Sequence, residues 1–252
     1  MNKDLKVIIA AVIAFVVVVA GIVTIAELNS RHTTPPTVPP WSPADFNAGT
    51  LASGNTTLNI TGDASSTLLT GNNTHHVYLN FYPSTNKDTL TYDSAVYNKS
   101  GTGANETLNM TSIVLNVEYR MNNDSLTETF TVKNTQSTEQ AISMNYQAVI
   151  STLTNVTVSQ GDPHHPVNAT LVPATFGYTE TYNFNNANLF AASFGNGVNC
   201  TFNWYSMEGI LNSGSLIFNS YSYNTTTLKL NFSGFSIPPY SSLTLGEMSV
   251  YY

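Results

Sequence analysis

The chain has 252 residues and a formal net charge of −7, and 9% of its residues are charged, against about 25% in ordinary soluble proteins. This acidic balance, without a basic stripe, excludes nucleic acid as a partner. The chain contains 14 Tyr and 12 Phe, which excludes a disordered protein, because disordered chains combine high charge with few aromatic residues. We therefore expect a folded protein with a neutral, polar surface.

Residues 7–26 form an apolar run, VIIAAVIAFVVVVAGIVTIA, that carries no charge. At a helical rise of about 1.5 Å per residue, a run of this length spans the ~30 Å of a bilayer core. Lys3 and Lys6 precede the run and Glu27 follows it, so residues 1–6 are expected to be a cytoplasmic tail. We predict a retained single-pass transmembrane helix in the cell membrane, in contact with the lipid bilayer, with the C-terminal domain extracellular.

Two other interpretations of this run stay open. A signal peptide could be cleaved after Ala26, because Thr24 and Ala26 are small residues at the positions that a signal peptidase recognises. Its apolar part would exceed the usual length of about 7 to 15 residues, however. The run also resembles the N-terminal helix of pilins and archaellins, which form filaments. Those families carry Gly or Ala between a basic residue and the apolar run, whereas here Lys6 meets Val7 directly.

Residues 27–44 are predicted to be a Pro-rich extracellular stalk. Within them, the stretch RHTTPPTVPPWSP (31–43) contains five prolines. Each proline fixes its own φ and pushes the preceding residue toward extended geometry, so the stretch should behave as a semi-rigid spacer. Such a spacer would hold the following domain away from the lipid head groups.

Residues 45–252 are predicted to form an all-β, antiparallel β-sandwich, Ig-like or larger, with no helix. The clearest strand is SIVLNVEYR, which alternates an apolar face with a polar one: Ile113, Leu115, Val117 and Tyr119 against Asn116, Glu118 and Arg120. The same alternation occurs in 77–81, 142–150 and 228–232, and in 126–132, where Glu128 interrupts the apolar face. Turns rich in Asn, Gly and Ser separate such runs, which is typical of a sandwich.

Two stretches resemble the Ig-like sandwich modules of archaeal and bacterial cell-surface proteins: FTVKNTQSTEQAISMNYQAV (130–149) and GFSIPPYSSLTL (234–245). In those modules an Asn-Thr-Gly turn follows one strand, and a Pro-Gly turn precedes the closing strand. This chain has Gln136 at the first glycine position and Tyr240 or Ser241 at the second. The scarcity of charge also resembles secreted proteins of crenarchaeal acidophiles. The resemblance implies a sandwich domain of a cell-surface glycoprotein.

Asn-x-Ser/Thr sequons are the candidate sites for N-linked glycans. There are twelve, where about eight would arise by chance from this composition, and all lie beyond the predicted anchor and stalk. They are Asn55, Asn59, Asn72, Asn98, Asn105, Asn109, Asn123, Asn155, Asn168, Asn199, Asn224 and Asn231.

Two histidine pairs are the candidate metal ligands: His75 with His76, and His164 with His165, near Asp162. Neighbouring residues of a strand point to opposite faces, so one histidine from each pair would have to meet to hold an ion. We favour polar surface positions for all of them, and we predict no cofactor.

Cys200 is the only cysteine, which excludes an intramolecular disulfide. We predict that it is a small buried residue, with an intermolecular bridge as the alternative. Trp204 and Tyr205 are the candidate exposed aromatic residues that would stack on sugars in a carbohydrate-binding module.

The predicted function is a membrane-anchored glycoprotein with a structural, adhesive or accessory-subunit role at the cell envelope, in contact with other envelope or membrane proteins and without enzymatic activity. A carbohydrate-binding surface module and a surface-filament subunit are the alternatives, followed by a metal-dependent extracellular hydrolase. We also predict resistance to acid, because only six Lys and Arg residues follow the anchor to pair with carboxylates.

Overall fold

The computed structural model of the chain describes residues 47–70, 76–85, 94–173, 178–185, 189–195, 198–206, 210–220 and 224–252. These residues belong to one compact unit, Phe46–Tyr252. The predicted tail, anchor and stalk (1–44) lie outside the described residues, so all three stay predictions. In the described part of the chain, no helix is long and apolar enough to cross a membrane.

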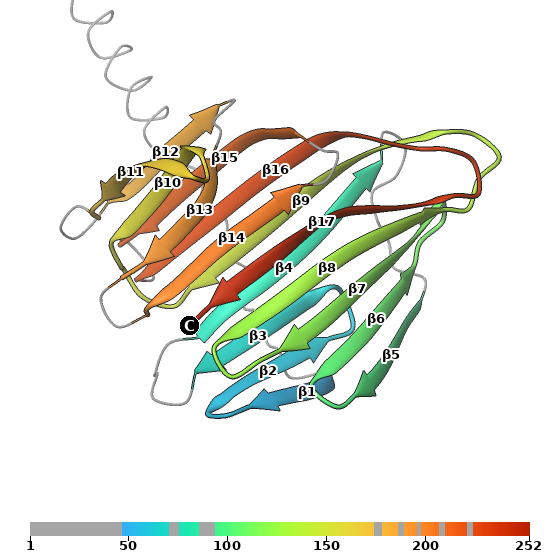
Figure 1. Cartoon of the computed structure of the whole chain (residues 1–252), viewed down its shortest axis with the longest axis horizontal. Coiled ribbons are helices and arrows are strands. Elements are labelled where there is room, and N and C mark those ends of the chain that lie inside the picture. Colours follow the sequence, from blue (N-terminus) through green and yellow to red (C-terminus); the bar gives the residue numbers. More distant parts are fainter. Residues whose placement is uncertain are drawn as a thin grey trace, which may run out of the picture. The chain divides into compact units, whose positions relative to one another are not determined.

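β-strands are the only regular secondary structure among the described residues, and they pair into two antiparallel sheets. The eight-stranded sheet has the order β1 (Asn47–Ser53), β2 (Thr56–Thr61), β3 (Ser65–Thr70), β4 (His76–Thr85), β9 (Gln140–Ile150), β16 (Thr225–Ile237), β15 (Ile210–Asn219), β12 (Thr179–Asn185). The nine-stranded sheet has the order β11 (His165–Leu171), β10 (Val156–Asp162), β13 (Leu189–Phe194), β14 (Cys200–Ser206), β17 (Ser242–Tyr251), β8 (Ser125–Asn134), β7 (Ile113–Met121), β6 (Gly103–Asn109), β5 (Ser94–Ser100). Figure 1 shows both sheets with their strands running along the same diagonal.

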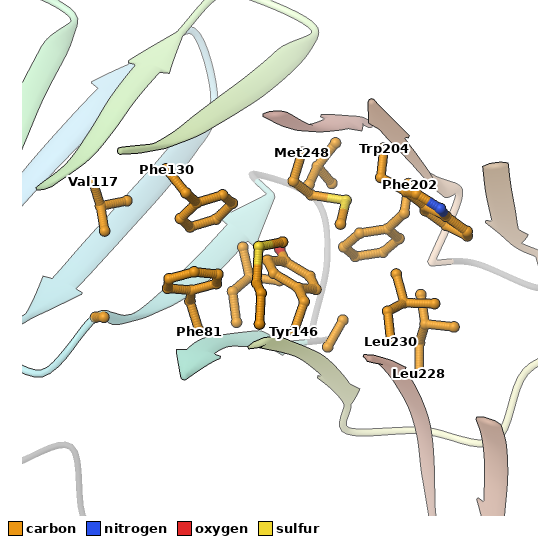
Figure 2. Close-up of a cluster of buried hydrophobic side chains, with 14 of the residues drawn as sticks. Phe81, Val117, Phe130, Tyr146, Phe202, Trp204, Leu228, Leu230 and Met248 are labelled. Carbon is orange, nitrogen blue, oxygen red and sulfur yellow. The ribbon is translucent and has the colours of Figure 1, made fainter. Parts of the chain in front are cut away.

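The core lies between the two sheets, because each strand turns its apolar side chains inward. β7 and β9 bury every second residue, as their period-2 patterns predict. In Figure 2, Phe130, Met248 and Phe202 of the nine-stranded sheet face Phe81 and Tyr146 of the eight-stranded sheet. The rings of Phe81 and Phe130 stack with centroids 4.0 Å apart. Each fully buried side chain of this size contributes about 1.5–3 kcal/mol.

The predicted sandwich is therefore confirmed, and of the two predicted sizes it is the larger. The long segment between Ile150 and Thr225 supplies six strands, β10 to β15, which extend both sheets. An Ig-like module needs about seven strands in all. The chain forms more than this number because β10, β11, β13 and β14 lengthen one sheet while β12 and β15 lengthen the other.

The two turns that carried the Ig-like resemblance do lie in contact. Asn134 is fully buried at the end of β8, and its Nδ2 donates to the carbonyl oxygens of Thr138, Ile237 and Pro238 over 2.8, 3.0 and 3.1 Å. Tyr240 adopts φ of 57° in the second turn, a left-handed conformation that glycine adopts more easily. The two stretches that resemble Ig-like modules therefore correspond to two turns in contact, and they do not identify the fold around those turns.

Candidate functional site

The outer face of the nine-stranded sheet carries a row of polar side chains. β7 buries Val117 and Tyr119, so the alternate residues Glu118 and Arg120 point outward. The register of β6, β7, β8, β17 and β14, which lie side by side in Figure 1, aligns one residue from each: Asn105, Glu118, Thr129, Glu247 and Tyr205. Adjacent strands are about 4.8 Å apart, so neighbours in this row lie within reach of one ligand.

A second row lies beside the first, two residues further along the strands. Its members are Gly103, Arg120, Thr127, Ser249 and Asn203. Members of both rows, with the hairpin ends at 100–102 and 121–122, line a hollow of about 730 Å³. Sites for small molecules have volumes of about 300–1,000 Å³, so this hollow is large enough for one sugar unit or a few.

The hollow contains one guanidinium and two carboxylates. The Nε of Arg120 donates to Oε1 of Glu118 over 2.7 Å, and Nη2 lies 2.6 Å from the same oxygen. The arginine side chain is 69% exposed, so this ion pair contributes only about 0–1 kcal/mol to stability. Glu247 accepts a hydrogen bond from Ser249 Oγ over 3.2 Å, and it forms no ion pair with another described residue. These groups therefore stay available to a ligand.

The two aromatic candidates point in opposite directions, because adjacent residues of a strand alternate. Tyr205 is 55% exposed and lies opposite Glu247 on the outer face. Trp204 is buried, and its Nε1 donates to the carbonyl oxygen of Leu189 over 3.0 Å. The prediction that Trp204 is an exposed sugar-stacking residue is therefore wrong, and Tyr205 is the aromatic side chain that could stack on a sugar.

Two other glutamates lie in the core instead of on this face. Glu106 of β6 is fully buried, accepts hydrogen bonds from the Ala64 N–H over 3.2 Å and from the Tyr119 hydroxyl over 3.0 Å, and does not reach the outer face. Burial raises the pKa of its carboxyl from 4.5 to about 7, while the two hydrogen bonds oppose the rise. Glu106 was not singled out from the sequence.

Glu128 is the residue that interrupted the apolar alternation, and it too is buried. Its carboxylate accepts hydrogen bonds from the Tyr146 hydroxyl over 2.7 Å and from Ser66 Oγ over 3.5 Å, both in the facing sheet. Burial raises the pKa of this carboxyl as well, from 4.5 to about 7. Among the described residues no cationic side chain pairs with either core carboxyl.

The predicted metal ligands are not gathered into a site in the described part of the chain. Asp162 and His165 lie at the exposed end of the β10–β11 hairpin, where His165 Nδ1 is 3.6 Å from Asp162 Oδ2. The backbone N–H of His164 donates to Asp162 Oδ1 over 2.9 Å, which is a local turn contact. His76 is exposed at the start of β4, and His75 lies outside the described residues. No described group of three His, Cys, Asp or Glu side chains could hold an ion.

Eleven of the twelve sequon asparagines lie among the described residues, and none of the eleven is buried. Asn72 lies outside them. Asn105 belongs to the polar row, so a glycan at this position would occupy the candidate site. The presence of glycans on these sequons stays a prediction.

The predicted burial of Cys200 is confirmed. The residue lies at the start of β14 and is 1% exposed. Burial raises the pKa of its thiol to about 12, which keeps the sulfur protonated and unreactive.

No family model matches the chain, and no curated protein matches it in sequence. Solved structures are similar in fold. A putative aldose 1-epimerase from Escherichia coli K12 is 9% identical, with a TM-score of 0.56 over 80% of this chain and 97% of its own. A galactose mutarotase-like protein from Lactobacillus casei is 8% identical, with a TM-score of 0.56 over 81% and 99%. A galactose mutarotase related enzyme from Lactobacillus acidophilus is 10% identical, with a TM-score of 0.55 over 81% and 97%.

These neighbours correct several predictions. The resemblance to Ig-like modules of archaeal surface glycoproteins is wrong, because the fold is that of galactose mutarotase-like proteins. A structural, adhesive, accessory or filament role at the envelope is wrong for the same reason, and the archaeal and glycoprotein character that went with it has no support here. The prediction that the chain is not an enzyme is also overturned, because this fold is shared with proteins named for chemistry on sugars.

Proposed function

We propose that the chain binds a sugar in the hollow on the outer face of the nine-stranded sheet and catalyses ring opening at its anomeric carbon. The observation that carries this proposal is that Glu118, Arg120 and Glu247 line one exposed hollow. The similarity in fold to a putative aldose 1-epimerase and to galactose mutarotase-like proteins directs the choice of substrate class.

Recognition would rest on two kinds of contact. Carboxylates accept hydrogen bonds from sugar hydroxyls, and a guanidinium donates several in a fixed plane, so Glu118 and Arg120 together suit a pair of neighbouring hydroxyls. The exposed ring of Tyr205 would pack against the C–H face of the sugar beside Glu247. Glu118 and Glu247 are separated by one strand, which puts their backbones about 10 Å apart and leaves room for a sugar ring.

The chemistry requires a base and a group that stabilises negative charge. Glu247 would take the proton of the C1 hydroxyl, the bond between C1 and the ring oxygen would break, and C1 would become a carbonyl. The ring oxygen would take a proton from solvent while Arg120 stabilises its developing charge, and closure on the other face of C1 would give the other anomer. Glu118 would act by holding Arg120 in position. General-base contributions of this kind are worth about 10²–10⁴-fold in rate.

The test measures anomer exchange of glucose, galactose, xylose and arabinose by polarimetry and by NMR, with saturation-transfer NMR for binding. We expect the protein to accelerate anomer exchange of at least one sugar, and we expect the catalysed rate to fall by about 10²-fold or more in Glu247→Gln. Glu139→Gln is the matched control, because Glu139 is exposed in the turn between β8 and β9 and lies outside the hollow. Unchanged exchange in Glu247→Gln, or binding without any acceleration, would refute the catalytic role.

A further inference from the structure

β11 is an edge strand, and among the described strands only β10 pairs with it. It ends the nine-stranded sheet, and six of its seven residues are exposed, so neither face is covered by another described element. Val167 at its centre is 69% exposed. The cross-strand contacts to β10 are formed: Ser159 Oγ donates to Asn168 Oδ1 over 2.8 Å, and the hydroxyls of Thr157 and Thr170 are 2.9 Å apart.

The position of Pro166 identifies which backbone groups of β11 face outward. In an antiparallel ladder, residues whose N–H and C=O point to the partner strand alternate with residues whose groups point away. The pairing of β11 with β10 continues through Pro166 and Gly161 without a shift, although proline has no N–H to give. Pro166 therefore holds an outward position. Asn168 and Thr170, two and four residues further on, hold outward positions too.

Nothing on β11 protects this edge by charge. Its sequence, HPVNATL, contains no Lys, Arg, Asp or Glu. At the other edge of the same sheet, β5 carries Lys99, whose Nζ donates to the carbonyl oxygen of Thr50 in β1 over 2.7 Å. Natural proteins use charged side chains to prevent sheets from joining at their edges, so of the two edges of this sheet the uncharged edge at β11 is the better suited to pairing.

We propose that β11 pairs antiparallel with the β11 of a second copy of the chain, about a two-fold axis at Asn168. In this register Asn168 faces Asn168 of the second copy, and their N–H and C=O groups form two hydrogen bonds. The Thr170 N–H of each copy donates to the Pro166 carbonyl of the other, which brings the total to about four. Val167 then lies opposite Ala169 of the second copy, which covers the exposed valine.

This pairing is self-complementary, as an interface with two-fold symmetry must be. The strand carries no charge that would repel its own copy. One pair of short strands buries less than the ~1,200 Å² of a stable interface, so we expect a weak dimer with a dissociation constant on the order of 100 μM. The hollow with Glu118 and Glu247 lies several strands away and stays open in both copies.

Residue-resolved hydrogen exchange on the full chain tests the pairing directly. The protein is made in a host that adds no glycans, so that Asn168 stays unmodified. The Asn168 and Thr170 amides should exchange freely at about 5 μM and become at least threefold slower at about 500 μM, around the expected dissociation constant. The Val167 and Ala169 amides bond to β10 and should be protected equally at both concentrations. Equal exchange of Asn168 and Thr170 at the two concentrations overturns the proposal.

Two variants at position 170 separate edge pairing from association through any other part of the chain. Thr170→Val keeps the outward N–H but loses the hydroxyl contact to Thr157, whereas Thr170→Pro loses both. We expect sedimentation to show concentration-dependent dimers for Thr170→Val and a loss of at least threefold in dimer for Thr170→Pro. Protection of Ala169 confirms that the hairpin is intact in each. If the sedimentation mass rises equally with protein concentration in both variants, the proposal is contradicted.

Discussion

The two core carboxyls predict that the sandwich is more stable in acid than at alkaline pH. Glu106 and Glu128 face the aromatic core and the hydroxyls of Tyr119 and Tyr146, with no cationic partner among the described residues. Among the described residues, Asp63, at the turn beside Ala64, and Glu128 both raise the pKa of Glu106 further. In the folded chain both carboxyls therefore hold their protons up to about pH 7.

The folded and unfolded states bind different numbers of protons, and this difference sets how the unfolding free energy changes with pH. In the unfolded chain these carboxyls ionise near pH 4.5, whereas in the folded chain they ionise near 7. Between those values the folded state binds more protons, so the unfolding free energy falls as pH rises, and it levels off above about 7. A rise from 4.5 to about 7 corresponds to about 3 kcal/mol for each carboxyl, because one pKa unit is worth about 1.4 kcal/mol.

The perturbation is the double variant Glu106→Gln/Glu128→Gln. Glutamine has the shape of the protonated acid, can accept from the Ala64 N–H, and does not ionise. We expect the wild-type unfolding free energy to fall by about 6 kcal/mol between pH 4 and pH 8, and the Tm to fall by about 12–24 °C. The double variant should lose most of this pH dependence and be the more stable protein at pH 8.

The assay is urea and thermal unfolding at intervals of half a pH unit, followed by tryptophan fluorescence, which the buried Trp204 reports. Glu139→Gln is the control, because its carboxylate is exposed and its removal should leave the pH dependence unchanged. A wild-type stability that is flat between pH 4.5 and 7, or a double variant that keeps the wild-type slope, would show that the two buried carboxyls do not cause the pH dependence. The acid resistance expected from the scarcity of ion pairs gains a second physical cause if the slope is observed.

Substitutions at two positions, Asn134 and Tyr240, test the packed turns. Asn134→Ala removes the donor shared by three carbonyl oxygens and should lower the unfolding free energy by about 3 kcal/mol. Asn134→Asp should destabilise the protein more at pH 8 than at pH 4, because its ionised carboxylate would face those oxygens. Urea unfolding at the two pH values measures both effects, and an equal loss of stability for Asn134→Asp at both would argue against the contact. Tyr240→Gly should stabilise the protein by up to about 1 kcal/mol, because it removes the left-handed strain at a φ of 57°. Tyr240→Ala keeps that strain, so an equal gain from alanine in thermal unfolding would assign the effect to the exposed ring instead.

Local properties of this protein could be derived from the sequence because they depend on neighbouring residues alone. The alternation in Ile113–Met121 and Gln140–Ile150 identified strands and their buried faces, since side chains of a strand point to alternate sides whatever lies beside it. The apolar run at 7–26 and the prolines after it are local in the same sense, and their structure stays a prediction. Cys200 was expected to be buried from its chemical type, and it is.

The candidate site was decided by the tertiary structure, because its members come from distant strands. Glu118 and Glu247 lie in β7 and β17, and only the register of β7 with β8 and of β8 with β17 places them on either side of Thr129. The sequence placed Glu118 and Arg120 on a polar face, but it carried no signal for what lies across from them. From the sequence, Asn105 was identified only as a candidate glycosylation site, although it belongs to the same row.

The sequence also could not predict which side chains face the core where the alternation of apolar and polar residues is ambiguous. Trp204 and Tyr205 are adjacent and both aromatic, so either could have been the exposed one, and the packing of β14 on the core buries Trp204. Glu128 looked like a fault in the alternation until Tyr146 and Ser66 of the facing sheet supplied its hydrogen bonds. The Ig-like resemblance failed because a short motif reports a turn, which is local, whereas the number and order of strands in a sheet depend on pairings between residues far apart in the chain.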